Sequence, residues 1–325
     1  MEPENVKLPP ILGWVGGKSK LKNTILDHVP NGHTVYVEPF VGGGSLFFAK
    51  DKKPKMVIND KNKELVKFYK VMREKGCQLF NTCQLPQNEK QFYAIKDKGD
   101  KRNTCDFLGL VKQSYGCKQD NANIKNNRTL KNSNVAKRCA DYERLLKKTV
   151  ILNRDFADVI QKYDSKNTFF YVDPPYPNTH RYHLPELPAE RVKEVLGGVK
   201  GKWLLSYSDT PEIRKLFRDY HIKKVKTKYT MQEATQKANG QEIHPKEVSE
   251  LLIANYDLND RSLGNPRPRN KMSMLPDVSN PHDNTVAKVG VGAMVVSVGA
   301  AMALKDPKNP VGWIAFGTGL MIAGS

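Results

Sequence analysis

The stretch from residue 34 to residue 60 constrains the fold more tightly than any other part of the sequence. Residues 34–40 (TVYVEPF) are rich in β-branched and aromatic side chains, which favour a strand. The glycines of 42–44 then predict a tight turn, residues 46–50 the start of a helix, and residues 55–60 (KMVIND) a second strand. A strand, a glycine turn, a helix and another strand open a parallel sheet, so we expect an α/β fold.

Later segments extend this pattern and then interrupt it. Residues 61–75 predict a helix, and the short apolar runs 168–172, 203–207 and 249–256 predict further strands. Residues 76–148 have scattered aromatic side chains, many Asn and Lys residues and little periodicity. We interpret them as an inserted module or long loops and not as part of the core.

The glycine turn and the acid after the second strand favour a ribose-bearing cofactor. Glycine lets the backbone approach a ligand that a Cβ atom would keep away. Asp60 lies eighteen residues after Gly42, where a carboxylate can accept both hydroxyls of a ribose. An ordinary tight turn is the alternative for the glycines alone, and the pair does not identify the cofactor.

A second glycine motif, residues 14–20 (WVGGKSK), precedes the first strand. It is not a phosphate-binding P-loop, because Leu12 stands where that motif requires its first glycine. Three interpretations of Lys18 are therefore open. Its ammonium meets a carboxylate, it meets a phosphate, or it is solvated at the start of a helix.

The segment DPPY, residues 173–176, follows directly on the apolar run 168–172. Ligands of open α/β sheets bind beyond the carboxyl ends of the strands. Two consecutive prolines remove two backbone donors and leave rigid carbonyl acceptors. A carboxylate, a fixed carbonyl and an aromatic ring together suit a planar amine, which needs acceptors for its N–H groups and a surface for its face. The alternative is a proline turn whose Tyr176 covers the core.

The charge of the chain indicates a polyanionic partner. The sequence has 53 Lys and Arg against 34 Asp and Glu, a net charge of +19, which favours nucleic acid or an anionic membrane surface. Residues 61–150 alone hold 21 basic and 9 acidic side chains, a net charge of +12. Most of the excess therefore lies in the interval that we interpret as an insertion.

The cysteines and the first residues favour an intracellular protein. The five cysteines form no C-x-x-C pair, which excludes a disulfide-scaffold protein and disfavours a zinc ribbon. The opening MEPENVKLPP lacks the basic and then apolar pattern of a secretory signal. We therefore expect a protein that is not secreted, in a reducing compartment.

The C-terminal part of the sequence differs from the rest. Residues 258–288 are polar and proline-rich, as in a linker. The uncharged runs 289–304 and 311–325 are both shorter than the usual span of about twenty residues. A membrane hairpin, an interfacial anchor and a hydrophobic tail that packs on itself or on a partner are all compatible with this pattern.

Taken in order, these motifs resemble the DNA adenine methyltransferase (Dam) family between about residue 8 and residue 257. The resemblance implies a Rossmann-like methyltransferase sheet, S-adenosylmethionine as cofactor, and methylation of the 6-amino group of a flipped-out adenine in double-stranded DNA. It also implies a catalytic domain formed by 1–60 and 149–257, with a mainly helical target-recognition region at 61–148.

The resemblance further assigns roles to residues. Asp173 and the Pro174 carbonyl would accept hydrogen bonds from the target amine, and Tyr176 would stack on the target base. SYSD, residues 206–209, would line the far wall of the pocket. The implied cofactor contacts are Trp14, Lys18, Glu38, Gly42, Gly44, Asp60, Asp155, Phe156 and Asp173.

DNA contacts are expected from the basic insertion, where Tyr115 stands at the place of the family's recognition turn. The candidate DNA-binding residues are Lys112, Tyr115, Lys118, Lys125, Arg128 and Lys131. His180 and His183 follow DPPY, but two histidines in a polar loop are usually solvated, and we expect no metal. The insertion does not match the family well enough to imply a recognition sequence.

Other functions stay open at this point. DPPY chemistry also suits methylation of adenine or cytosine amines in RNA. A nicotinamide or flavin enzyme would use the same glycine turn, but would have no use for DPPY or for a basic insertion. A catalytically inactive protein that tethers DNA or a membrane is the non-enzymatic alternative.

Overall fold

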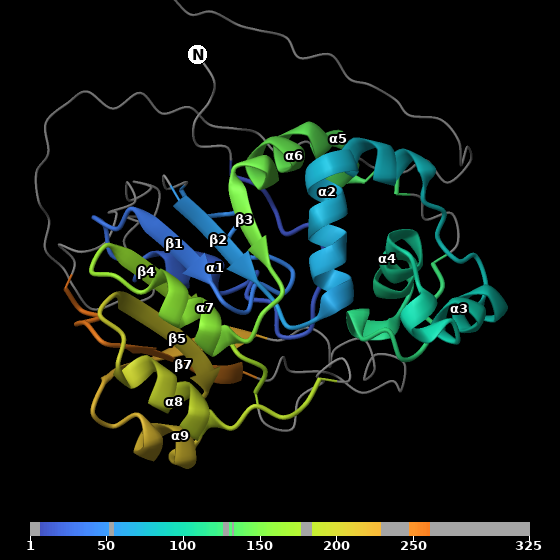
Figure 1. Cartoon of the computed structure of the whole chain (residues 1–325). Helices are drawn as coiled ribbons and strands as arrows, with labels where there is room; N and C mark the ends of the chain where they lie inside the picture. The colour runs from blue at the N-terminus through green and yellow to red at the C-terminus, as the bar shows by residue number, and fades with distance from the viewer. Residues whose placement is uncertain are drawn as a thin grey trace, which may run out of the picture. The chain divides into compact units, whose positions relative to one another are not determined.

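The computed structural model describes residues 7–51, 55–125, 130–131, 133–176, 184–228 and 247–260, which contain a seven-stranded sheet (Figure 1). The strands are β1 (Val35–Glu38), β2 (Lys55–Asn59), β3 (Thr149–Leu152), β4 (Thr168–Val172), β5 (Lys202–Ser208), β6 (His221–Lys228) and β7 (Glu247–Ala254). They follow the order β3-β2-β1-β4-β5-β7-β6. The first five are parallel, which confirms the predicted α/β, Rossmann-like sheet.

The direction in which the chain builds the sheet reverses between β1 and β4. From β1 the chain moves outward through β2 to β3, and it then returns to the other side of β1 to form β4 and β5. Ligands of such sheets bind beyond the carboxyl ends of the strands at this reversal. Glu38 ends β1 and Asp173 follows β4, so both acidic residues lie at the expected binding edge.

Strand β7 adds a third acidic residue to the same edge. It pairs antiparallel with β5 and with β6, so the beginning of β7 lies beside the end of β5. In this register Glu250 is opposite Ser208. A residue far along the chain is thereby brought to the edge that carries Asp173.

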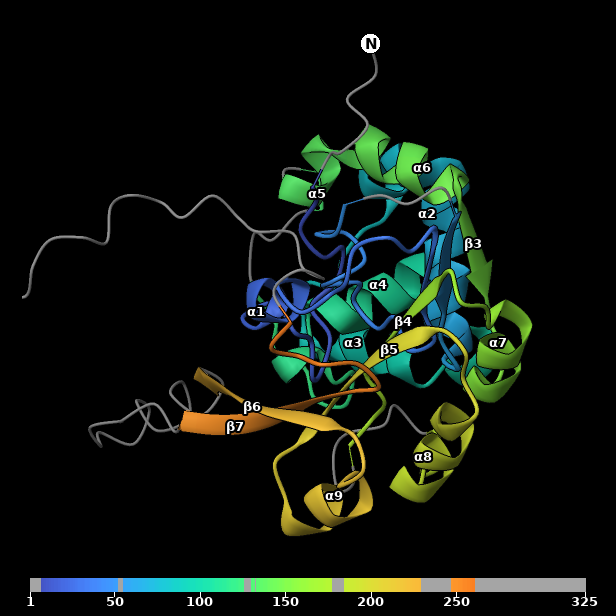
Figure 2. The same cartoon turned by 90° about the vertical axis from the view of Figure 1, so that its left-hand side faces the viewer.

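Side chains alternate between the two faces of the sheet, and each face has its own hydrophobic cluster. On β4, Phe169 and Tyr171 enter one cluster, and Phe170 and Val172 enter the other. The second cluster is covered by α7 (Phe156–Tyr163), α8 (Ala189–Gly197) and α9 (Pro211–Leu216). Figure 2 shows α7 and α8 on one side of the strands and α1 (Lys22–Leu26) on the other.

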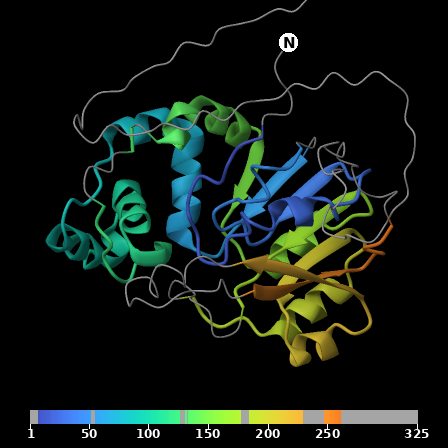
Figure 3. The same cartoon turned by 180° about the vertical axis from the view of Figure 1, so that it is seen from behind.

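The first cluster joins the sheet to the helices that follow β2. The helices of this region are α2 (Lys63–Thr82), α3 (Glu89–Lys96), α4 (Thr104–Lys112), α5 (Asn134–Lys137) and α6 (Cys139–Lys147), with short 3-10 turns η1 (Gly99–Lys101) and η2 (Tyr115–Cys117). Helix α2 stands between the strands and helices α3 and α4 (Figures 1 and 3). The predicted helix over 61–75 is therefore confirmed, and it extends to Thr82 with a kink at Lys75.

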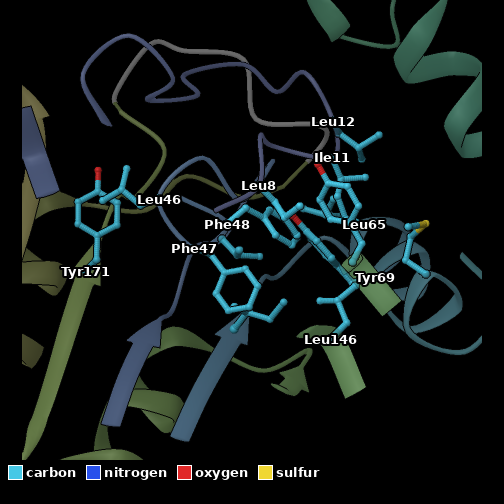
Figure 4. Packing of buried hydrophobic residues seen from close by; sticks show 14 of the residues in the cluster. Leu8, Ile11, Leu12, Leu46, Phe47, Phe48, Leu65, Tyr69, Leu146 and Tyr171 are labelled. Atoms are coloured by element: carbon cyan, nitrogen blue, oxygen red, sulfur yellow. The ribbon is translucent and has the colours of Figure 1, made fainter. Parts of the chain in front are cut away.

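The interpretation that residues 76–148 lie outside the core is wrong. Leu79, Phe107, Tyr142 and Leu146 are buried in the same cluster as the sheet side chains. Figure 4 shows Leu146 near Tyr69 of α2 and the aromatic pair that follows the glycine turn. The apolar positions of these short helices are too irregular to show a long amphipathic period, although tertiary packing buries them.

The predicted helix at 46–50 is also wrong, because this segment forms turns. Leu46, Phe47 and Phe48 are all buried. Isolated helical hydrogen bonds are present, from the Phe48 N–H to the Gly44 carbonyl at 3.0 Å and from the Lys50 N–H to the Leu46 carbonyl at 2.8 Å. They do not continue into a regular helix, and the segment forms separate turns whose apolar side chains are buried in the first cluster.

Two disulfides connect these helices, which the sequence analysis did not predict. Cys77 of α2 pairs with Cys139 of α6, with 5.0 Å between their Cα atoms, and Cys83 pairs with Cys105 of α4 at 5.1 Å. The expectation of a reducing compartment gave no reason to pair cysteines. Their pairing depends on helix packing that spacing alone does not reveal.

Strands β3 and β6 were not predicted, whereas the strands expected at 34–40, 55–60, 168–172, 203–207 and 249–256 are present as β1, β2, β4, β5 and β7. In the described ranges, no helix is long and apolar enough to cross a membrane. The linker expected at 258–288 is described only to residue 260, and the apolar runs 289–304 and 311–325 lie outside the described residues.

Candidate active site

A cavity of about 440 Å³ opens at the carboxyl edge of the central strands. It is lined by residues 14–18, by the ends of β1 and β2, by the segment after β3, and by the segment after β4. The structure thus brings together most of the predicted cofactor and catalytic residues. Those that line the cavity are Trp14, Lys18, Glu38, Gly42, Asp60, Asp155, Phe156, Asp173, Pro174 and Tyr176. Gly44 is not among the lining residues.

Two glycines of the turn lie in close contact with aromatic rings, which leaves no room for a side chain. Gly42 has a φ of +48°, and a Cβ atom on it would lie 2.8 Å from the Trp14 ring. Gly44 has a φ of +75°, and its Cβ atom would lie 2.6 Å from the Phe48 ring. Gly42 therefore gives the indole its place at the cavity wall, whereas Gly44 serves core packing.

Asp60 is held in place by backbone donors. Its carboxylate accepts the N–H of Gly42 at 3.0 Å and the N–H of Asn62 at 2.9 Å. Burial raises the pKa of Asp60 to about 6, although these hydrogen bonds oppose the shift. The Lys61 N–H also donates to this carboxylate. Because a carboxylate has about four lone-pair sites, it can still accept a hydroxyl donor from a ribose.

The segment NRDF, residues 153–156, is tied to the ends of β1 and β2. The buried Asn59 side chain donates to the Pro39 carbonyl at 2.9 Å and accepts the Arg154 N–H at 2.9 Å. The Asn153 side chain donates to the Asp60 carbonyl at 2.8 Å. These bonds fix the position of this segment relative to Asp60, and sequence reasoning did not identify Asn59.

An aromatic and cationic sandwich lies beside Asp155. The rings of Phe40 and Phe156 are 5.2 Å apart, and the Arg191 guanidinium lies 5.1 Å from the Phe156 ring centroid. Arg191 also pairs with Asp155 at 2.8 Å, and Asp155 caps α7 by accepting the Ala157 N–H. Asp155 and Phe156 both line the cavity, where they offer a carboxylate acceptor and an aromatic surface to a ligand. Arg191 was not predicted, because α8 lies far along the chain.

Lys18 is buried among carboxylates. Its ammonium is 2.8 Å from Asp173 Oδ1 and 3.6 Å from Glu250 Oε2, and it donates to the Gly16 carbonyl at 2.9 Å. Burial alone lowers the pKa of Lys18, but the two carboxylates together hold it above its usual value. Of the three interpretations left open by the sequence, the carboxylate contact is the one that the structure supports.

Asp173 has a perturbed pKa in this cluster. Burial raises the pKa of Asp173 to about 6; the Lys18 ammonium lowers it, and the Glu250 carboxylate raises it further. A carboxyl group with this pKa is ionised at neutral pH and can accept N–H donors. Perturbed carboxyl groups in a cavity are characteristic of reactive sites.

Tyr176 lies on the rim of the same cluster. Its ring stacks on Tyr207, with centroids 5.1 Å apart and planes 15° apart. Its hydroxyl lies 3.2 Å from Glu250 Oε2 and 3.4 Å from Asp173 Oδ1. Tyr176 therefore combines both interpretations from the sequence, since it packs against the core and lines the cavity.

Glu250 is the main site residue that sequence reasoning missed. It is 2% exposed, and it directly precedes the apolar residues 251–254 of β7. A charged residue at a buried position of a strand is rare unless it is paired. That anomaly within SELLIANY was the signal that could have identified it.

Two of the predicted DNA-binding residues, Tyr115 and Lys118, lie in a strained turn. Ser114 and Ala122 form a bridge, and Gly116, Cys117 and Gln119 between them have positive φ angles. Tyr115 is 42% exposed at the start of this turn, where its N–H donates to the Asn121 carbonyl at 3.0 Å. Of the predicted lysines, Lys112, Lys118, Lys125 and Lys131 are described, whereas Arg128 lies outside the described residues, as do His180 and His183.

This turn is adjacent to the cavity wall. A Cβ atom on Gly13 would lie 2.6 Å from the Cys117 sulfur, so the turn packs directly against the segment that carries Trp14 and Lys18. A polymer that contacts Tyr115 would therefore pass close to the cavity. Such an arrangement fits a site that acts on one unit of a long polyanion.

Comparison with known proteins decides the family. Residues 14–231 match the model of the D12 class N6 adenine-specific DNA methyltransferase family. The chain belongs to this family. The predicted resemblance to DNA adenine methyltransferases is thus confirmed, and the hydride-transfer alternative is excluded.

Three proteins that the chain is similar to come from a bacterium and from two viruses. The chain is 25% identical over 293 residues to the type II methyltransferase M1.LlaDCHI of Lactococcus lactis subsp. cremoris, covering 79% of this chain and 98% of the relative. It is 26% identical over 270 residues to the type II methyltransferase M.CviBI of Paramecium bursaria Chlorella virus NC1A, covering 77% and 100%. It is 26% identical over 241 residues to the DNA N-6-adenine-methyltransferase of Escherichia phage P1, covering 64% and 31%.

Membership of the D12 family makes the protein an enzyme that methylates adenine at N6 in DNA. A reaction of this kind needs a methyl donor and a DNA substrate. The cavity and the basic region around Tyr115 are the parts of the described structure that suit these two requirements.

Proposed function

We propose that this methyltransferase takes its methyl group from S-adenosylmethionine and holds a flipped-out adenine of double-stranded DNA against Asp173, the Pro174 carbonyl and Tyr176. The observation that carries the proposal is the junction of two half-sites in one cavity. Asp60 and the Phe156 sandwich form one half, and the cluster around Asp173 forms the other.

The cofactor half fits S-adenosylmethionine by the chemistry of its residues. Asp60 would accept the ribose hydroxyls, and Asp155 and Phe156 would hold the adenine ring. Glu38 and Gly42 would border the methionine part, near Trp14 and Lys18. When bound, the cofactor supplies an electrophilic methyl group on a sulfonium. The acidic side chains at this edge favour that positive charge.

The catalytic half would position the target amine. Its nitrogen lone pair is delocalised into the base, so two acceptors must hold its hydrogens while the nitrogen becomes pyramidal. Asp173 and the Pro174 carbonyl supply such acceptors, and Tyr176 supplies a stacking surface worth about 1–3 kcal/mol. The nitrogen lone pair forms the new N–C bond as the C–S bond breaks, and the electron pair of that bond stays on sulfur. The amine then releases one proton to Asp173 and onward to water.

The aromatic surface of Tyr176 matters because the target adenine must leave the duplex before it can react. The amine of adenine lies inside the duplex, and extruding the base costs a few kcal/mol. Stacking on Tyr176 offsets part of this cost. The Tyr207 ring beneath Tyr176 fixes its orientation, so the surface is formed before the base arrives.

We also propose that residues 1–60 and 149–257 act as the catalytic domain and residues 61–148 as the target-recognition region. The exposed Tyr115 turn and its lysines support this division. An intracellular location, the absence of a metal and a membrane role for 289–325 stay predictions. Carbonate extraction of the full chain and of a form ending at residue 260 would test the membrane role.

The direct test is methyl transfer from labelled S-adenosylmethionine to duplex DNA and to matched RNA, followed by analysis of the nucleosides. We expect N6-methyladenine in DNA. Asp173→Ala should abolish transfer and leave cofactor binding largely intact, whereas Asp219→Ala, outside the cavity lining, should leave transfer unchanged. Absence of the modified base from DNA would refute the proposal, and full activity of the Asp173 variant would remove Asp173 from the site.

A further inference from the structure

Glu250 is placed beside the reactive cluster by the topology of the sheet. Because β7 runs opposite to β4 and β5, its early residues lie at the carboxyl edge, where Glu250 is opposite Ser208 of β5 and Val225 of β6. The side chain is 2% exposed, and its Oε2 contacts the Tyr176 hydroxyl and the Lys18 ammonium. Burying a carboxylate is costly unless it is paired, so this position depends on those contacts.

The cluster contains one ammonium group for two carboxylates. Lys18 lies 2.8 Å from Asp173 and 3.6 Å from Glu250, and within the described residues these are the carboxylates that pair with it. The other titratable groups that face the cluster are the phenols of Tyr171 and Tyr176. From β6 the neighbour in register is the uncharged Val225. The surplus negative charge therefore comes from Glu250.

We infer that Glu250 is a positioning residue for methyl transfer, which shares the Lys18 ammonium with Asp173 and fixes Tyr176 through its hydroxyl. This inference rests on the proposed function. Without the Glu250 charge, Lys18 would pair with Asp173 alone and compete with the target amine for its oxygens. With that charge present, Asp173 keeps acceptor capacity for the amine and for the proton that the amine releases.

The decisive variant is Glu250→Gln, which keeps the size and an acceptor oxygen but removes the charge. We expect kcat to fall on the order of tenfold or more, as for other misplaced reacting groups, while KM for the cofactor stays within about twofold. The acidic limb of the kcat profile should move to lower pH, because the Glu250 carboxylate raises the pKa of Asp173. Glu250→Asp keeps the negative charge, so it should recover part of the lost kcat and bring the acidic limb back toward its wild-type pH.

Controls separate this role from a structural one. Glu194→Gln makes the same chemical change at an exposed position of α8 outside the cavity lining, and it should alter neither kcat nor the pH profile. Loss of stability without a shift of the acidic limb would assign Glu250 a structural role and overturn the inference. Unchanged kcat in an active Glu250→Gln enzyme would overturn it as well.

A readout that needs no turnover keeps the inference distinct from the proposed function. Carboxyl-carbon NMR titration should give a lower pKa for Asp173 in Glu250→Gln than in the wild-type protein. Equal values would overturn the inference whether or not the enzyme is active. Failure of the wild-type protein to methylate DNA would instead count against the proposed function.

Discussion

At the scale of single residues, Asp60 and Asp173 illustrate two uses of a buried carboxylate. Both have a pKa raised to about 6 by burial, but Asp60 is surrounded by backbone donors and Asp173 by charged side chains. Backbone donors cannot move away, so they suit a group that only orients a ligand. Charged neighbours can respond to a change of protonation, which suits a group at the reacting atoms.

The raised pKa of Asp60 predicts that cofactor binding weakens as pH falls. The ionised carboxylate is the better acceptor for hydroxyls, and its fraction drops below about pH 6. We expect the Kd for S-adenosylmethionine to rise between pH 7.5 and pH 5, measured by calorimetry. Asp60→Asn should bind about 10-fold to 100-fold more weakly, the loss of a charged hydrogen bond, with little pH dependence.

The effect of Asp60 on stability has the opposite sign. A carboxyl group whose folded pKa lies above its model value of 3.8 stabilises the fold most at low pH, and this contribution is lost as pH rises through about 6. Protonation of Asp60 therefore weakens cofactor binding but favours the folded state. A cofactor Kd that stayed constant over this range would remove Asp60 from the binding site.

Gly42 is the second residue for which the structure predicts a measurable effect. Gly42→Ala combines a positive φ with a Cβ atom 2.8 Å from the Trp14 ring, so it should displace the indole and weaken cofactor binding. Gly99→Ala is a matched control, because Gly99 has a φ of +53° and no neighbour within 4 Å of its Cβ position. Backbone strain alone costs about 1–2 kcal/mol.

Calorimetry and urea unfolding distinguish the two glycine variants. Both should lose stability, but only Gly42→Ala should also lose cofactor affinity. Equal affinities in the two variants would show that the contact between Gly42 and Trp14 has no part in binding.

At the scale of elements, local sequence predicted a strand wherever a short apolar run contained β-branched or aromatic side chains. It failed for β6 (HIKKVKTK), where lysines occupy positions of an edge strand and conceal the pattern. It failed again for residues 46–50, which form separate turns buried in the first cluster. In both segments the local pattern alone does not decide the structure.

The strained turn at 114–122 carries the prediction that belongs to this scale. Tyr115→Ala should weaken binding to duplex DNA by about 1–3 kcal/mol, the contribution of one base–aromatic contact. Tyr93→Ala removes an equally exposed ring from α3, since the two rings are 42% and 40% exposed. Fluorescence anisotropy should show a loss of affinity for the first variant alone. Equal losses would mean that Tyr115 contributes only as exposed apolar surface.

At the scale of the whole molecule, the site joins segments that are distant in sequence. The cofactor half could be predicted because its residues stand in short motifs at the ends of β1, β2 and β3. Glu250 was missed, because its contact with Tyr176 spans 74 residues and depends on an antiparallel strand added after the parallel ones. Arg191 was missed because it lies on α8, and its contact with Asp155 spans 36 residues. Sequence motifs thus identify many of the residues that bind ligands. The topology of the sheet and its helices determines which charged side chains surround those residues.

The distribution of charge over the molecule gives the last prediction. If residues 61–148 contact the phosphates, then changing Lys112, Lys118, Lys125 and Lys131 together to Glu should lower DNA affinity. It should also flatten the plot of log K against log salt, because each phosphate contact contributes a slope of about −0.9 for duplex DNA.

The matched control changes four exposed lysines elsewhere in the described structure: Lys162, Lys166, Lys200 and Lys215. Both variants alter net charge by the same amount, so long-range electrostatics affect them similarly, whereas only the first removes direct contacts. We therefore expect the slope to fall in the first variant and to stay close to the wild-type value in the second. An equal change in both would mean that the excess of +19 acts as a general field, and it would move the DNA contacts away from the insertion.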